Sequence, residues 1–202
     1  MSHPEFFDTV PRITLHDPLA ELLGAADQGL ITYGYPDAVK LAGHSCPTVA
    51  GAYLMTLKAL GALYPDRPPE RGDIRVGLKA AQAEGTAGVV GAIAGLLTGA
   101  AGEGGFKGLG GRYARRDLLR FSAGIDAELR FTRGDTQAGV TVRYRPECVP
   151  PAPELQALMP RVVAGEASAA ERTEFGRLWQ MRVKRILIDH FDDPELVQCA
   201  AA

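Results

Sequence analysis

Residues 41–55, LAGHSCPTVAGAYLM, mark the place where the chain turns out of one helix and into another. Gly43 is suited to the left-handed backbone conformation that ends a helix. Pro47 is suited to the first position of a helix, because it has no backbone N–H to satisfy. Residues 44–46 therefore form a tight turn, here called the elbow, between a short helix that starts at Asp37 and a long helix that follows.

The elbow contains a histidine and a cysteine that are separated by one residue. Cys46 is predicted to be the N-cap of the long helix, where unpaired N–H groups and the helix dipole favour a negative charge. This position favours the thiolate, the form of cysteine that binds metals and attacks electrophiles. Because the backbone turns here, the side chain of His44 can reach the same point. The pair predicts a metal site; the alternative is a buried cysteine beside a histidine that bonds a backbone carbonyl.

A zinc site needs three or four ligands, so other residues must complete the predicted one. We expect His16, next to a helix start in ITLHDPL, and Glu84, just after a strand in AQAEGT, to do so. The alternatives are a histidine that only packs and a glutamate that is only solvated. His190 and Cys199 are further candidates near the C-terminus.

The hydrophobic pattern outward from the elbow predicts an α+β fold. The long helix has an apolar stripe at 3.6-residue spacing, formed by Ala50, Tyr53, Leu54, Leu57 and Leu60. Further helices are expected at 18–23, 37–42 and 88–97, and from the capping box of Ser168 and Glu171 to about Asp189. Strands are expected at 30–33, 74–78, 117–122, 127–133 and 139–145, the last two as a hairpin. We predict a mixed or antiparallel sheet packed against helices in a core of residues 1–147, followed by a proline-rich link and a helical C-terminal extension in residues 148–202.

The composition is that of an ordinary soluble globular protein. Of the 202 residues, 46% are hydrophobic and 23% are charged, and the net charge of −2 predicts no non-specific attraction to nucleic acid or anionic membranes. The N-terminus, MSHPEFFDTVPR, has no cationic start followed by an apolar run, so we expect no secretory signal and a cytoplasmic location. The three cysteines form no CxxC, so we expect no disulfide framework; a single Cys46–Cys148 or Cys46–Cys199 bridge is the alternative.

An uncharged stretch at 85–102, GTAGVVGAIAGLLTGAAG, raises the question of a membrane helix. A spanning helix needs about 20 mostly apolar residues, and this stretch is short and rich in glycine. Gly91, Gly95 and Gly99 would form a bare ridge on a helix, which suits close packing in a membrane or in a soluble protein. We favour the soluble helix, in contact with a neighbour inside the chain or in a second copy of it.

A glycine-rich basic loop at 102–117, GEGGFKGLGGRYARRD, is the second candidate for binding. Its backbone N–H groups and its cations could surround an anionic ligand, and we expect Lys107, Arg112 and Arg116 to bind it, with Arg115 nearby. The loop lacks the order GxxxxGK[ST] of a nucleotide-binding P-loop, and it precedes a predicted strand, not a helix. The alternative is a flexible loop with solvated arginines.

Together these motifs resemble the FmdE-like family, which takes its name from a component of formylmethanofuran dehydrogenase, over roughly residues 15–145. Gly43, His44, Cys46 and Pro47 match the family elbow His-Gly-His-x-Cys-Pro-Gly, with Ala42 and Thr48 in place of its first His and last Gly. GLLTG followed by GFKGLGG resembles the family's Leu-Thr-Gly helix end and Gly-Lys-Gly loop. The resemblance implies an α+β core, often dimeric, with a metal or catalytic pocket around the elbow. Many members also end in a cysteine-rich zinc-ribbon-like domain, which the two remaining cysteines cannot form.

Three functional hypotheses follow. The first is a metal-binding protein that holds zinc or a similar divalent ion with His44, Cys46, His16 and Glu84 and supports metal-assisted chemistry on an anionic small molecule. The second is a metal-free enzyme with Cys46 as the catalytic nucleophile. The third is a non-enzymatic binder or chaperone of a metal or of a tetrapyrrole such as haem, whose iron a His or Cys can ligate. We expect a homodimer with a small-molecule ligand.

Overall fold

The computed structural model describes residues 3–202, and it has the α+β class expected from the sequence. The helices are α1 (Pro18–Leu22), α2 (Tyr35–Ala42), α3 (Pro47–Leu63), α4 (Ala87–Thr98), α5 (Pro153–Val163) and α6 (Ala169–Lys184). Shorter turns are the 3-10 helices η1 (Glu5–Thr9), η2 (Asp27–Gly29) and η3 (Pro146–Cys148), and α6 continues into the π-helical turn η4 (Arg185–Asp189). The strands are β1 (Ile13–His16), β2 (Leu30–Tyr33), β3 (Ile74–Leu78), β4 (Leu119–Arg120), β5 (Leu129–Arg133), β6 (Gly139–Tyr144) and β7 (Val197–Ala201).

The strands form two sheets. β1 and β2 pair as an antiparallel ribbon, and the other five form a mixed sheet in the order β4-β3-β5-β6-β7. β4 is parallel to β3, whereas the other neighbours are antiparallel. β5 and β6 form the hairpin that the sequence predicts, and Gln137, with a φ of 62°, lies in its turn. The expected mixed sheet is therefore present.

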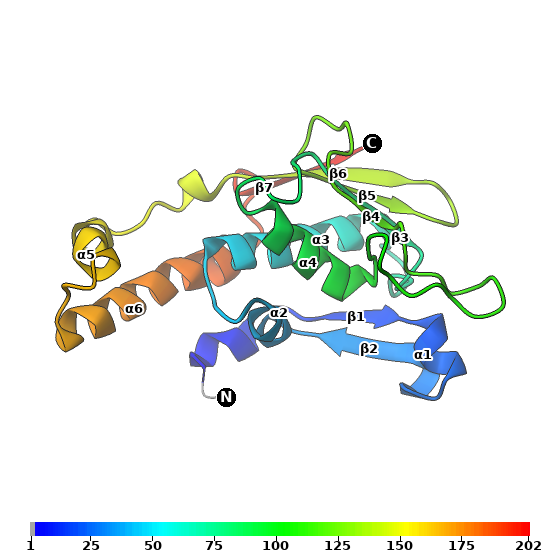
Figure 1. Cartoon of the computed structure of the whole chain (residues 1–202), viewed down its shortest axis with the longest axis horizontal. Helices are drawn as coiled ribbons and strands as arrows, with labels where there is room; N and C mark the ends of the chain where they lie inside the picture. The colour runs from blue at the N-terminus through cyan, green and yellow to red at the C-terminus, as the bar shows by residue number, and fades with distance from the viewer. Residues whose placement is uncertain (1–2) are drawn as a thin grey trace.

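The helix α3 lies at the centre of the molecule. Twelve of its seventeen residues are buried, because the sheet lies on one side and α2 and the β1–β2 ribbon lie on the other (Figure 1). α4 packs beside α3 under the same sheet. The residues of the apolar stripe expected on α3 are buried, and so are residues on other faces of the helix, because α3 is covered on most sides.

The glycines of α4 make close packing contacts with other parts of the same chain. A side chain at Gly91 would meet the ring of Phe121 at 2.7 Å, and one at Gly95 would meet the carbonyl oxygen of Ala100 at 2.7 Å. Gly99 is not on the helical ridge, because it is the left-handed C-cap with a φ of 74°. The small residues therefore allow close contact of α4 with the segment that follows it.

The strand expected at 117–122 is shorter than the sequence pattern suggests. Only Leu119 and Arg120 pair with β3. Asp117 and Ser122 have φ values of 62° and 52°, which take the backbone out of the extended conformation on both sides. The expected helix at 37–42 begins two residues earlier, at Tyr35, because Asp37 is its third residue and not its cap. The carboxylate of Asp37 accepts a hydrogen bond from the N–H of Gly34 at 2.9 Å.

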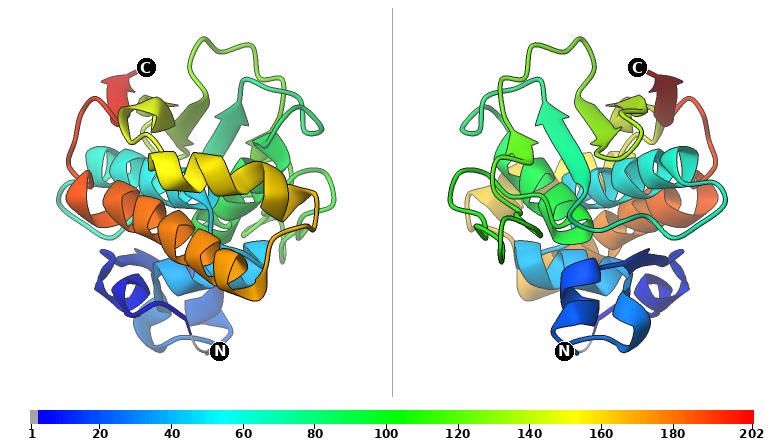
Figure 2. Two further views of the ribbon diagram at one scale, coloured as in Figure 1. Left: turned by 90° about the vertical axis from the view of Figure 1, so that its left-hand side faces the viewer. Right: turned by 90° about the vertical axis from the view of Figure 1, so that its right-hand side faces the viewer.

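The C-terminal part has two elements that the sequence pattern did not predict. α5 follows the proline-rich break and packs across α6 (Figure 2). β7 returns to the main sheet and pairs with β6 from Val197 to Ala201. The helix opened by Ser168 is present, and Ser168 and Glu171 form the predicted capping box.

Candidate functional site

The elbow has the predicted backbone geometry. Gly43 ends α2 in the left-handed conformation, with a φ of 74°, and Pro47 is the first residue of α3. Cys46 is the N-cap, and its Sγ accepts a hydrogen bond from the N–H of Val49 at 3.4 Å. The sulfur therefore satisfies one of the N–H groups that the first turn of α3 leaves free. All three cysteines are free, and Cys46 is partly exposed.

Helix α6 holds the elbow in place through Ser45. The carbonyl oxygen of Ser45 accepts hydrogen bonds from Nε1 of Trp179 at 3.0 Å and from Nε2 of Gln180 at 3.2 Å. Its hydroxyl donates to Oε1 of Gln180 at 3.0 Å and lies 2.8 Å from the hydroxyl of Tyr35. The contacts with α6 join residues 134 or 135 positions apart, so the elbow is a fixed part of the fold.

The four residues expected to hold a metal are not brought together. His44 is exposed, and its Nδ1 lies 2.9 Å from the carbonyl oxygen of its neighbour Ala42. The ring nitrogens of His16, on β1, lie within hydrogen-bond distance of the carboxylates of Glu70 and Glu21. Glu84 lies in another loop, where its carboxylate accepts a hydrogen bond from the N–H of Ala81. Among residues 3–202, no three His, Cys, Asp or Glu side chains lie close enough to hold a metal ion. As residues 3–202 are arranged, their side chains do not form a three- or four-ligand zinc site, and metal binding at His44 and Cys46 stays a prediction.

The basic loop is anchored by Arg115. Its Nη2 donates to Oδ1 of Asp17 at 2.6 Å, and Nη1 of Arg71 donates to Oδ2 of the same carboxylate at 2.8 Å. Burial opposes ionisation of Asp17, but hydrogen bonds from Arg71 and from the N–H of Ala20, together with the charge of Arg115, outweigh it and lower its pKa. Burial lowers the pKa of Arg115, and the charge of Asp17 acts against this. This network is buried and ties the loop to the N-terminus of α1.

The three loop residues expected to bind a ligand do not share this anchoring role. Arg112 stacks on the ring of Tyr113 at 4.9 Å, and Arg116 lies 4.0 Å from the carboxylate of its neighbour Asp117. Lys107 is exposed. Anion binding by Lys107, Arg112 and Arg116 stays a prediction.

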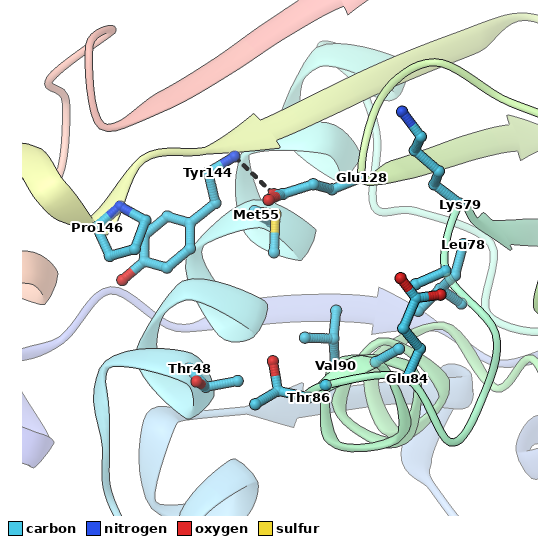
Figure 3. Close-up of a pocket in the computed structure, with 13 residues that line it drawn as sticks. Thr48, Met55, Leu78, Lys79, Glu84, Thr86, Val90, Glu128, Tyr144 and Pro146 are labelled. Carbon is cyan, nitrogen blue, oxygen red and sulfur yellow. Dashed lines mark hydrogen bonds between the residues drawn. The ribbon is translucent and has the colours of Figure 1, made fainter.

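A cavity with an apolar floor lies at the N-terminal ends of α3 and α4, where they meet the sheet (Figure 3). Its volume is about 540 Å³. Buried side chains from three elements form its floor: Met55 of α3, Leu78 of β3 and Ala87 of α4. The rest of its wall is formed by Thr48, Lys79, Ala80, Glu84, Gly85, Thr86, Val90, Glu128, Tyr144 and Pro146.

Tyr144 forms one wall of this cavity and is held from two sides. Its hydroxyl donates to the carbonyl oxygen of Pro47 at 2.9 Å. Its ring lies directly on the backbone of Gly51, where a side-chain carbon would approach it to 2.3 Å. Burial raises the pKa of Tyr144, so the hydroxyl stays protonated and keeps donating this hydrogen bond. The wall is therefore rigid and is attached to the first turns of α3.

Two carboxylates lie at the rim of the cavity. Oε2 of Glu128 accepts a hydrogen bond from the N–H of Tyr144 at 2.8 Å (Figure 3). Burial raises the pKa of Glu128, with a smaller contribution from the charge of Glu147, while the hydrogen bond from Tyr144 acts against both. Glu84 lies on the opposite side, next to Leu78.

Among the residues that line this cavity, the sequence predicts a binding role only for Glu84, and that role is to hold a metal ion. Glu128 and Tyr144 fall in the strands predicted at 127–133 and 139–145, and the sequence predicts no function for either. No signal in the sequence singles out Glu128, because it lies inside the strand predicted at 127–133 like any other polar strand residue. Nothing in the sequence pairs it with the N-terminus of α3.

A scan against models of known protein families gives no match to this chain, and a search of curated protein sequences gives none either. The resemblance to the FmdE-like family therefore stays a prediction. Within residues 3–202, none of the helices combines the length and the apolar character needed to cross a membrane.

Proposed function

We propose that the protein binds a small organic molecule in the cavity at the N-terminal ends of α3 and α4. The observation that carries this proposal is the cavity itself, about 540 Å³ in volume with a floor of Met55, Leu78 and Ala87. Ligand sites in proteins commonly have volumes of about 300–1,000 Å³, with mostly apolar walls and a few polar groups. The cavity fits this description.

The walls suit a ligand with an apolar body. The ring of Tyr144 and the side chain of Val90 face each other across the floor, and the hydroxyls of Thr48 and Thr86 lie at one side (Figure 3). A rigid wall lowers the entropy lost on binding, because fewer side chains must be ordered. Tyr144, fixed by Pro47 and Gly51, supplies such a wall.

A set of fragments of about 10 non-hydrogen atoms, containing cations, anions and neutral molecules, tests this proposal by two-dimensional NMR of the full chain. We expect some fragments to shift the signals of Met55 and Val90. The substitution Val90→Trp fills the cavity and should weaken their binding at least about tenfold, since a tenfold change corresponds to only about 1.4 kcal/mol. The matched control is Val163→Trp, the same change at a side chain that is 77% exposed on α5. No binding at the cavity, or equal binding by wild type and Val90→Trp, would contradict the proposal.

A reactive or metal-bound Cys46 is a second candidate function. The contact that favours it is the hydrogen bond from Val49 N–H to Sγ at the start of a seventeen-residue helix. Such a bond, and the helix dipole, stabilise a thiolate. His44 is two residues away and exposed, so it is accessible as a base or as a further metal ligand.

Alkylation of Cys46 by iodoacetamide at pH 7.5 distinguishes the two forms of this candidate. The experiment uses a Cys148→Ser, Cys199→Ser background, so that only Cys46 reacts, and measures bound metals by elemental mass spectrometry. A nucleophilic thiolate reacts faster than glutathione with or without a chelator. A metal-bound thiolate reacts slowly until the chelator removes a near-stoichiometric metal, and that metal is lost in Cys46→Ser. Reaction no faster than glutathione in a metal-free protein would contradict both.

A further inference from the structure

We infer that the ligand of this cavity carries a cationic group, such as a primary amine or a guanidinium, on its apolar body. The inference rests on the proposed function, and it adds the chemical class of the ligand. It is based on which charged groups line the cavity and where each of them points.

Glu128 is the charged group best placed to contact a ligand. Its carboxylate lies beside Met55, above the floor of the cavity (Figure 3). Oε2 accepts the N–H of Tyr144, and no other hydrogen bond to this carboxylate is formed within residues 3–202. A carboxylate has about four lone-pair positions, so Glu128 keeps free acceptor capacity that faces the cavity.

Glu84 adds a second negative charge on the opposite side. One of its oxygens, Oε2, accepts the N–H of Ala81 at 3.1 Å, which fixes the side chain at the rim. A cationic head group bound at Glu128 would also be attracted by the charge of Glu84 from across the cavity. A hydrogen bond between a charged donor and a charged acceptor is roughly twice as strong as a neutral one.

Lys79 is the one cationic side chain among the residues that line the cavity, and it does not neutralise the glutamates. It makes no ion pair within 4.0 Å in the part of the chain that the structure describes. Its side chain extends away from Glu84 and Val90, toward solvent (Figure 3). The field inside the cavity is therefore set by the carboxylates more than by this lysine.

The N-terminal ends of α3 and α4 act in the opposite direction, because they favour an anion. Each helix end corresponds to about half of a positive charge, and the effect is confined to the first turn. In α3, the N–H of Val49 is already engaged by Sγ of Cys46. Two full negative charges on the walls outweigh these partial charges, so the cavity selects a cation.

Three molecules with the same phenylethyl body separate charge from shape: 2-phenylethylamine, 2-phenylethanol and 3-phenylpropanoate. Their dissociation constants are measured with the full chain by NMR titration at pH 8, which favours the carboxylate form of Glu128 although burial raises its pKa. We expect the amine to bind at least about tenfold more tightly than the alcohol, and the propanoate to bind most weakly; tenfold corresponds to about 1.4 kcal/mol. Higher salt should reduce this preference, because it screens exposed charges.

The variant Glu128→Gln keeps the shape of the side chain and removes its charge, so it should reduce the preference for the amine over the alcohol and leave only the contribution of Glu84. The matched control is Glu166→Gln, which removes an exposed glutamate in the turn between α5 and α6 and should change nothing. The inference is overturned if the propanoate binds as tightly as the amine, if the preference for the amine is unchanged in Glu128→Gln, or if only acidic and neutral fragments bind. Those results would still agree with a ligand site in this cavity. If no fragment of any charge class binds there, the proposed function itself is contradicted.

Discussion

His16 shows how a residue considered for a metal site takes part in ion pairs instead. Its Nε2 lies 3.0 Å from Oε2 of Glu21, and its Nδ1 lies 3.2 Å from Oε2 of Glu70. A neutral imidazole donates through one nitrogen only, whereas the imidazolium donates through both. The hydrogen bond with Glu21 is the largest effect; it and the interactions with Glu70 raise the pKa of His16 against the opposing effect of burial.

This geometry predicts a contribution to stability that depends on pH. The pKa of His16 is higher in the folded chain than its unfolded value of about 6.5, so the contribution is complete below about pH 6.5 and is lost as the pH rises through the folded value. The variant His16→Gln should lower the free energy of unfolding by about 0.5–1 kcal/mol at pH 5.5 and by less at pH 9, as expected for partly exposed ion pairs.

Urea unfolding at the two pH values measures the difference. His44→Gln is the control, because His44 has no carboxylate within 4.0 Å in residues 3–202. A destabilisation by His16→Gln that is the same at both pH values would contradict the prediction.

At the scale of single residues, the sequence identifies roles that depend on near neighbours. Cys46 is the N-cap expected before Pro47, because a capping side chain acts on N–H groups two or three residues away, and Asp17 caps α1 before Pro18 in the same way. Contacts between residues that are far apart in the sequence cannot be predicted in this way. The ion pair between Asp17 and Arg115 joins positions 98 residues apart, and no periodic pattern marks it.

At the scale of the elements, α3 and β6 meet through one glycine. The ring of Tyr144 occupies the space above Gly51 where a side chain would be, with three ring atoms within 2.7 Å of the position of an added carbon. An alanine at 51 therefore requires Tyr144 to move, and Tyr144 is also the wall of the cavity. Forcing extra volume into a well-packed region typically costs about 1–3 kcal/mol.

The variant Gly51→Ala should therefore lower the free energy of unfolding by about 1–3 kcal/mol and weaken binding of cavity fragments. The control lies on the same helix: Gly61 is exposed, with no atom within 4 Å of an added side-chain carbon. Gly61→Ala should raise the free energy of unfolding by about 0.5–1 kcal/mol, because alanine favours a helix more than glycine does. Urea unfolding of both variants tests this, and equal effects of the two substitutions would contradict it.

Elements with a strong periodic pattern or a clear cap are predicted correctly from the sequence, and those that depend on a partner are not. β3 and the β5–β6 hairpin follow the expected alternation. β7 has only a short apolar pattern, and it is a strand because the edge of β6 is there to pair with it. α5 starts at Pro153 in a segment whose prolines predict a break, but proline is also favoured at the start of a helix.

At the scale of the whole molecule, residues 148–202 complete the core that residues 1–147 begin. Val183, Ile186, Leu187 and Leu196 are fully buried and belong to the same hydrophobic cluster as α3. β7 covers the edge of β6, and α6 holds the elbow through Trp179 and Gln180. The boundary expected at 147 marks the proline-rich link, while the segment beyond it packs against the core and joins its sheet.

This arrangement predicts that a fragment of residues 1–147 does not fold alone. Burial of the four side chains contributes roughly 6–12 kcal/mol, which is as large as the whole free energy of unfolding of an ordinary domain, about 5–15 kcal/mol. The fragment would also expose the edge of β6, which invites aggregation. Thermal unfolding followed by circular dichroism should therefore show a cooperative transition for the full chain and none for the fragment. Addition of a peptide of residues 148–202 should restore the transition, because it supplies β7 and the buried face of α6 together. A fragment that unfolds cooperatively within a few degrees of the full chain would instead mean that residues 1–147 form an independent core, and that the C-terminal segment serves mainly to hold the elbow.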